Sequence, residues 1–222
     1  MSCEKLRMDM NNACTSVIRK YFQEVVLVNK NDIQEFYIQS PQFRNFNTDR
    51  YLFSFVLKQG TRGYRITNTY NGNVVFGSYN KTEEEDIPQY KHIVQISMTG
   101  IDEETKVFLD QLDFSNYVAF IQSTSGLIEV YGFQYGLKTE DYEYNPVNNN
   151  GGALITLSSD EDILEDERPY VYVSAIEGNE NEDFNNNFEN NNTLPDIQKL
   201  IVDHEDEYIV NHNNYYLTTE NY

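Results

Sequence analysis

The sequence predicts a mainly β protein, a β-sandwich or barrel with one or two short helices and an extended acidic C-terminal arm. About ten short segments rich in β-branched and aromatic residues support this class, whereas only one segment has a clear helical pattern. The 222 residues include 18 Tyr and 13 Phe, and 39% are hydrophobic, which is enough for one substantial core. No repeat of fixed period is present, which argues against a solenoid or a propeller.

The N-terminal part is expected to hold an arm or short helix over residues 1–20, followed by a mainly β domain at 21–176. A helix from Asp9 to Lys20 would place four residues on one face: Met10, Cys14, Val17 and Ile18. Strand patterns then cover Tyr21 to Val28, Ile33 to Gln39 and Tyr51 to Lys58. The last of these alternates apolar residues on one side, which predicts one buried face: Tyr51, Phe53, Phe55 and Leu57.

Two turn signals follow. The Asn-Gly pair at Asn71-Gly72 predicts a hairpin between Tyr64–Thr67 and Val74–Phe76. The acidic stretch from Glu83 to Pro88 is predicted to be a loop, because its like charges repel and proline interrupts regular structure. A strand is expected to resume from His92 to Met98.

The clearest helix pattern runs from Glu103 to Leu112. Asp102 can cap its first turn, and three apolar residues are expected to point toward the core: Val107, Phe108 and Leu112. Asn116–Gln122 and Leu127–Phe133 are predicted to form a second hairpin through Ser123–Gly126. Gly136 to Tyr144 is expected to be an edge strand.

The last strands of the domain are predicted at Ala153–Leu157 and Pro169–Val173, with the acidic Ser158–Arg168 loop between them. Beyond Ile176 the composition changes, and residues 177–222 are expected to be an acidic, Asn-rich linker and C-terminal arm. Glu177 to Asn192, almost entirely Asn, Glu and Asp with two isolated Phe, is interpreted as a linker or disordered stretch. Short apolar patches in Leu194–Tyr222 predict docking on a neighbouring chain, as an added strand.

The charge is strongly negative and unevenly distributed. With 16 basic and 36 acidic residues the formal charge is −20, which argues against a protein that grips nucleic acid through phosphate neutralisation. Residues 1–80 carry +4, residues 81–150 carry −9 and residues 151–222 carry −15. Unlike patches of this kind attract one another between copies of a chain, although an acidic solvated tail alone would give the same count.

Cysteine use and hydropathy indicate where the chain is made. The only cysteines are Cys3 and Cys14, so no disulfide framework is predicted and a reducing compartment is expected. The N-terminus lacks the apolar run of a signal peptide, and no stretch of 18 apolar residues occurs. We therefore expect synthesis in the cytoplasm and no membrane span.

The sequence contains no convincing catalytic, cofactor or metal motif, and no such residue is predicted. His204-Glu205 begins like a zinc-protease helix, but Tyr208 stands where the second histidine is required. His92 lies in a strand pattern, which favours a structural or surface role. The carboxylates at 160–162 and 165–167 could hold a hard cation, but a solvated charge run is the default interpretation.

Near-alternating aromatic residues leave two interpretations open: Tyr131, Phe133, Tyr135, Tyr142 and Tyr144. They could form sheet core and cross-strand pairs, which we favour for most of them. Alternatively, they could stack on sugars or on another protein.

Several motifs resemble structural proteins of tailed bacteriophages of gut Bacteroides, including the crAss-like phages. The motifs span roughly residues 50–175: Gly72–Gly77, Ile87–Tyr90, Tyr131–Leu137, Tyr142–Pro146, Gly151–Ala153, Leu157–Ser159 and Leu164–Tyr172. The resemblance implies a neck or tail ring below the portal, or a tail-tube subunit, in several copies. Its partners would be further copies, portal, tail or ring proteins, and DNA that passes through the channel without specific binding.

The leading hypothesis is therefore a non-enzymatic virion protein, a subunit of a head-to-tail connector or tail ring located in the tail or neck. An acidic face lining the channel would repel DNA phosphates and favour free passage. The alternative is a carbohydrate-binding β-module on a phage or cell surface. An acidic glycosidase with two specific carboxylates is a third hypothesis.

Overall fold

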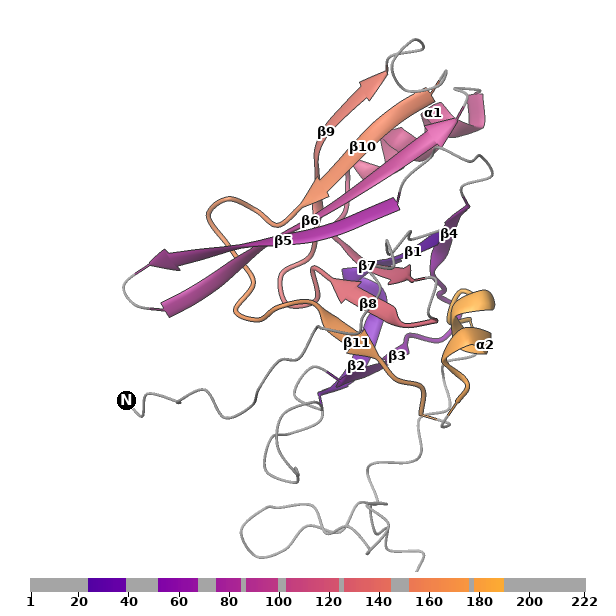
Figure 1. Cartoon of the computed structure of the whole chain (residues 1–222). Coiled ribbons are helices and arrows are strands. Elements are labelled where there is room, and N and C mark those ends of the chain that lie inside the picture. Colours follow the sequence, from indigo (N-terminus) through magenta and orange to yellow (C-terminus); the bar gives the residue numbers. More distant parts are fainter. Residues whose placement is uncertain are drawn as a thin grey trace, which may run out of the picture.

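The computed structural model describes residues 24–38, 52–67, 75–84, 87–99, 103–123, 126–144, 152–175 and 178–189. Two sheets pack face to face, and the larger one is curled (Figure 1). The sandwich-like, mainly β fold with two short helices confirms the predicted class.

The larger sheet has seven strands in the order β2-β3-β11-β8-β7-β1-β4. Its strands are β1 (Glu24–Asn29), β2 (Ile33–Ile38), β3 (Leu52–Leu57), β4 (Tyr64–Thr67), β7 (Tyr117–Gln122), β8 (Ile128–Tyr131) and β11 (Tyr170–Tyr172). Neighbours are antiparallel except for β3 and β11, which are parallel. A 3₁₀ turn at Lys30–Asp32 joins β1 to β2.

The smaller sheet has four strands in the order β5-β6-β10-β9, all antiparallel to their neighbours. These are β5 (Val75–Glu84), β6 (Ile87–Thr99), β9 (Lys138–Tyr144) and β10 (Gly152–Ser158). The two helices are α1 (Glu103–Leu112) and α2 (Glu180–Asn185). None of the helices in the described part of the chain has the length and apolarity needed to cross a membrane.

The central strands of the larger sheet are buried on both faces. On β1, Val25 and Leu27 point into a core between the two sheets, while Val26 and Val28 point into a second core on the opposite face. The same alternation recurs on β7, where Ala119 contributes to the first core. An uninterrupted apolar run such as that of β1 is typical of a strand that is covered on both sides.

The second core is closed by α2, so the interpretation of Glu177–Asn192 as a linker or disordered stretch is wrong over the described residues 178–189. Phe184 and Phe188 are fully buried against β3 and β7 aromatics, with the Phe188 and Phe120 ring centroids 4.7 Å apart. Asp183 fixes the helix by accepting hydrogen bonds from the hydroxyls of Tyr172 and Ser174, both at 2.7 Å. Two buried aromatic rings outweigh the polar composition of the segment.

The predicted hairpin between Tyr64–Thr67 and Val74–Phe76 is wrong. β4 pairs with β1 in the larger sheet, and β5 pairs with β6 in the smaller one. Ile66 and Val75 still meet in the same core, from opposite sheets. β4 and β5 therefore belong to different sheets, and Asn71-Gly72 lies outside the described residues.

The predicted loop at Glu83–Pro88 is also wrong over the described residues, because β5 and β6 stay paired as far as Glu84 and Ile87. Glu83 pairs with Pro88 and Glu84 with Ile87. Pro88 is tolerated because its nitrogen points away from β5. Tyr90, two residues later, donates its backbone N–H on that same side to the Glu165 carbonyl at 2.7 Å.

The remaining predictions are mostly confirmed. Phe53, Phe55 and Leu57 share a buried face of β3, the β7–β8 hairpin forms, and β9 is an edge strand. Helix α1 has the predicted bounds, but Val107 faces solvent and Leu109 fills its expected place in the core. Residues 1–20, residues 148–151 and the C-terminal arm from residue 190 lie outside the described residues.

Candidate interaction surface

The smaller sheet presents an open outer face. Its inner face packs on the larger sheet through buried residues such as Val94 and Ile155. The alternate residues point outward: Phe76, Ser78, Ile93, Gln95, Ser97, Leu154 and Thr156. Phe76 is 45% exposed and the others are partly exposed. The same face carries the exposed carboxylates of Asp141 and Glu143 on β9, so it combines uncharged and acidic residues.

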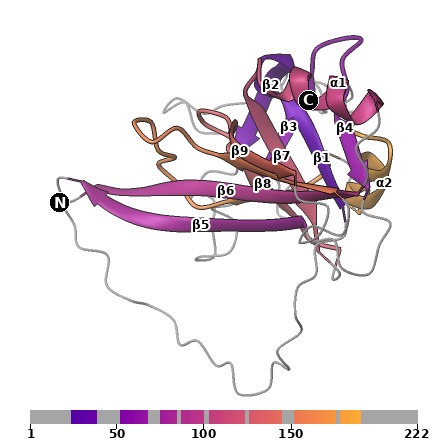
Figure 2. The same ribbon diagram turned by 90° about the horizontal axis from the view of Figure 1, so that it is seen from above.

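The β5–β6 hairpin projects beyond this sheet. β10 pairs with β6 only from Ile93 to Thr99, whereas β5 accompanies β6 as far as Ile87. The outer half of the hairpin therefore extends past the other two strands, and both views show the two strands leaving the body (Figures 1 and 2). Thirteen residues of strand give β6 a length of roughly 40 Å.

The outer edge of β5 presents backbone groups that face away from β6. His92, opposite Tyr79, directs its N–H to the Ser159 hydroxyl at 3.1 Å and its carbonyl to the Ser159 N–H at 2.9 Å, both away from β5. The two residues are therefore a non-hydrogen-bonded pair, and Tyr79 turns its own N–H and carbonyl away from β6. No described strand pairs with that edge, which makes it a template for another strand.

Gly77 on β5 allows the smaller sheet to pack closely against Tyr131 of the larger sheet. The ring of Tyr131, from β8, lies against Gly77 of β5 so closely that a Cβ at position 77 would overlap its far end. The Tyr131 hydroxyl donates a 2.8 Å hydrogen bond to Glu129. Burial, with the carboxylate of Glu129 as a second cause, raises the pKa of Tyr131, so this hydroxyl stays protonated.

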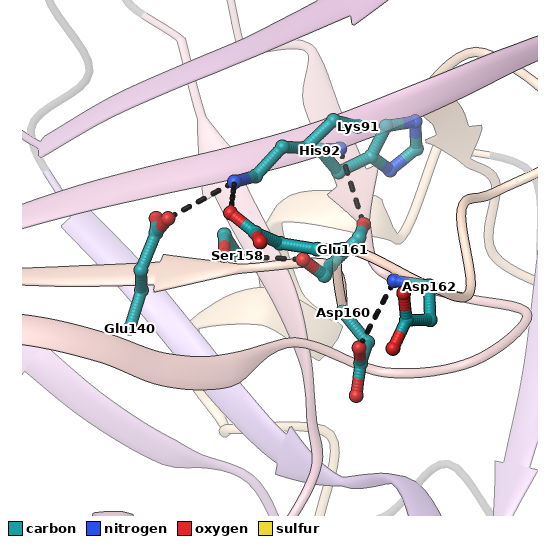
Figure 3. Close-up of polar contacts among 8 residues, drawn as sticks. Lys91, His92, Glu140, Ser158, Asp160, Glu161 and Asp162 are labelled. Atoms are coloured by element: carbon teal, nitrogen blue, oxygen red, sulfur yellow. Dashed lines mark hydrogen bonds and ion pairs between the residues drawn. The ribbon is translucent and has the colours of Figure 1, made fainter.

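The loop at 159–169 braces the projecting hairpin from the side. Tyr90 and Glu165 exchange two backbone hydrogen bonds, at 2.7 and 3.0 Å. On the outer face the ammonium of Lys91 pairs with Glu140 of β9 at 2.9 Å and with Glu161 of the loop at 3.7 Å (Figure 3). The hydrogen bond to Glu140 raises the pKa of Lys91 and lowers that of Glu140. Lys91 thus connects β6, β9 and the loop.

Glu165 is the buried anchor of that loop. Its carboxylate accepts the backbone N–H groups of Gln134 at 2.8 Å and Tyr135 at 3.1 Å, and the residue is 1% exposed. Burial raises the pKa of Glu165, while the two N–H donors and the charge of Lys30 oppose that shift. The carboxylate therefore holds the β8–β9 turn against the loop rather than facing solvent.

His92 has a structural role, as predicted. Its Nδ1 accepts the backbone N–H of Gly132 and its Nε2 lies 3.0 Å from the Glu167 carbonyl, which requires a neutral ring with the proton on Nε2. Burial lowers the pKa of His92 to about 4. The ring joins the hairpin, the β8–β9 turn and the loop at one buried point.

The acidic run at 160–167 contributes contacts that hold the loop on its neighbours. Asp160 pairs with Lys138 at 2.6 Å, which lowers the pKa of Asp160, and Asp160 also accepts the N–H of Asp162. In the described part of the chain, no three His, Cys, Asp or Glu side chains are grouped as a metal site requires. The default interpretation of a solvated run is wrong for Glu165, because its carboxylate is buried.

The near-alternating aromatic residues separate into two groups. Tyr131 and Phe133 are buried in the two cores, whereas Tyr135 and Tyr142 are 44% and 47% exposed. Tyr135 donates toward Asp166 at 3.4 Å in the turn before β9. Along β9, Tyr142 follows Lys138 by four residues, which is a backbone length of roughly 13 Å. The side chain of Tyr144 and the residues His204 to His212 are outside the described part.

Comparison with protein families, with curated proteins and with solved structures finds no match in any of the three searches. The assignment of function therefore depends on the geometry above and on the sequence motifs.

The contacts by which Lys91 and Glu165 hold the 159–169 loop could not be predicted from the sequence. Single charged residues within strands, such as Lys91 and Glu140, have no distinctive pattern, and their partners are far apart in the sequence. A glutamate between Leu164 and Asp166 is indistinguishable by composition from its solvated neighbours. One sequence signal could have indicated the continuous β5–β6 hairpin: apolar and polar residues alternate over a long stretch both before and after Glu83–Pro88.

Proposed function

We propose that this protein is a non-enzymatic structural subunit of a tailed-phage virion, building a ring at the head-to-tail connector or tail through which DNA passes. The phage assignment is supported by the sequence motifs that resemble virion proteins of gut Bacteroides phages. The ring assignment is supported by the arrangement of the smaller sheet. Its partners would be further copies and neighbouring portal, tail or ring proteins.

One observation carries the proposal: the two free edges of the smaller sheet run antiparallel to each other. Each strand is antiparallel to its neighbour along β5-β6-β10-β9, so with four strands β5 and β9 have opposite directions. The β5 edge of one copy can therefore pair in antiparallel fashion with the β9 edge of the next copy in the same orientation. Such a heterologous contact, repeated by rotation, generates a ring.

The side chains at these edges support the same contact. Tyr79 on β5 and Tyr142 on β9 are 45% and 47% exposed. Tyr79 lies opposite His92 and Tyr142 opposite Ile155, so both tyrosines are on the inner face of the sheet. Aromatic pairs across neighbouring strands stabilise sheets by up to about 1 kcal/mol each.

The outer face suits a surface past which DNA moves. Its positions on β5, β6 and β10 are mainly uncharged, β9 adds the exposed carboxylates of Asp141 and Glu143, and the ammonium of Lys91 is held by two carboxylates. Such a face offers phosphates little attraction, in keeping with a chain of formal charge −20.

Electron microscopy of the purified full-length protein tests the proposal. Closed rings of one diameter, which also associate with portal or tail components, are expected. A protein that stays monomeric at all concentrations and binds no such component contradicts it, and binding of that monomer to glycans would favour the carbohydrate-binding alternative.

A further inference from the structure

One side of helix α1 carries apolar side chains that the body of the protein leaves uncovered. Val107 is 52% exposed, and Phe114, two residues beyond the helix, is 88% exposed. Leu109 and Leu112 occupy the opposite side of the helix and fill the core between the sheets. The apolar character of Val107 and Phe114 is therefore not explained by the core of this chain.

The uncovered side chains form a row along the helix. Glu103, Val107 and Gln111 recur every four residues, so helical geometry places them on one side of α1, and Phe114 follows two residues beyond the end of the helix. An open hollow of about 290 Å³ lies along this row, lined by Glu103, Val107, Phe108 and Gln111. We call this side of α1, together with Phe114, the α1 face.

The α1 face lies in an acidic setting. Residues 103–114 hold four carboxylates and one ammonium, a formal charge of −3: Glu103, Glu104, Asp110, Asp113 and Lys106. An apolar row flanked by carboxylates favours a partner that is apolar on one side and basic at its borders.

Residues 1–23 of this chain have that chemistry. They contain four basic and two acidic residues, a formal charge of +2: Lys5, Arg7, Arg19 and Lys20 against Glu4 and Asp9. The helix predicted at 9–20 would also present an apolar side, because Met10, Cys14 and Val17 are separated by four and three residues.

We propose that residues 1–23 dock on the α1 face, with the apolar side of their predicted helix covering Val107 and Phe114 and their basic residues near the carboxylates of α1. The segment joins β1 at Glu24, and 23 residues reach up to about 75 Å when extended. The α1 face is thus accessible to the segment of the same copy or of an adjacent copy. This docking does not depend on ring formation, so the experiment below tests it independently of the proposed function.

Photo-crosslinking in the full-length protein tests the docking. A benzophenone amino acid replaces Val107, and the adducts are mapped by mass spectrometry after irradiation. The matched control places the same group at Ile163, an apolar residue of the 159–169 loop that is 48% exposed. We expect the adducts from position 107 to fall within residues 1–23, within one copy or between two, and those from position 163 to fall elsewhere.

Electrostatics and protease protection give independent readouts. The double substitution Arg19→Glu and Lys20→Glu, or raised salt, should lower the crosslinking yield from position 107 several-fold. Val107→Glu should speed tryptic cleavage after Lys20 about tenfold while leaving the circular dichroism melt unchanged, because its side chain faces solvent. Adducts outside residues 1–23, equal adducts to that segment from position 163, or unaltered cleavage of the variant would overturn the proposal.

Discussion

The guanidinium of Arg65, on β4, lies over the ring of Phe184, on α2, with 4.7 Å between the guanidinium carbon and the ring centroid. The same guanidinium donates to the Asn187 side chain at 3.0 Å, to the Phe184 carbonyl and to the carboxylate of Glu24. One side chain thus ties the C-terminal helix to an edge of the larger sheet, where three acceptors and an aromatic face meet.

Arg65→Lys should destabilise the fold by about 1–3 kcal/mol. A lysine keeps the charge but lacks the planar guanidinium group. It therefore cannot donate hydrogen bonds to all three acceptors and stack on the Phe184 ring at the same time. Urea unfolding followed by circular dichroism measures the loss. Arg62→Lys is the matched control, since Arg62 is exposed and lies 5.9 Å from the Tyr64 ring, and it should change stability little. Equal effects of the two substitutions would contradict this account of α2.

Truncation after Ile176 should abolish or severely weaken folding, whereas truncation after Glu189 should leave the thermal melt close to that of the whole chain. The first removes the fully buried rings of Phe184 and Phe188, each worth about 3–5 kcal/mol. The second removes none of the described contacts. Two truncated chains of the same stability would show that α2 does not close the second core.

Gly77→Ala should cost about 1–3 kcal/mol, because its Cβ would overlap the Tyr131 ring in a packed interface. Combining it with Tyr131→Leu should cost less than the two single changes added together, since the smaller side chain makes room. Ser78→Ala, on the outer face of the same strand, serves as the control. Additive effects in denaturant unfolding would mean that the two residues do not compete for this space.

The stability should fall with acidification partly through His92. Its pKa is about 4 in the folded protein and about 6.5 in the unfolded chain, so its contribution is complete above pH 6.5 and is lost as the pH falls toward 4. The loss amounts to about 3 kcal/mol at most. His92→Gln, whose amide can still accept from Gly132 and donate to Glu167, should remove this part of the slope. Parallel stability curves of the two proteins over that pH range would refute the neutral, buried ring.

The sequence predicted the class and most of the strands, because apolar alternation and continuous apolar runs are local signals. It failed where a distant partner decides the outcome. The Asn-Gly pair predicted a hairpin, yet Ile66 and Val75 belong to different sheets and meet only through the core. Phe184 and Phe188 looked isolated among polar residues, because the sheet that buries them is far away in the chain. Only spatial contacts could identify Glu165 as a buried anchor.

In the proposed ring, copies join through the outer edge of β5, and blocking that edge tests this mode of assembly. Tyr79→Pro removes a backbone N–H that faces away from β6, so the β5–β6 pairing is retained while the edge loses one donor and gains a ring that obstructs an approaching strand. Tyr79→Ala removes the same ring but keeps the N–H. By mass photometry and electron microscopy, the alanine variant should still form rings, fewer than the parent protein, and the proline variant should remain monomeric with an unchanged circular dichroism spectrum. Rings formed by the proline variant as readily as by the parent would contradict edge-to-edge assembly.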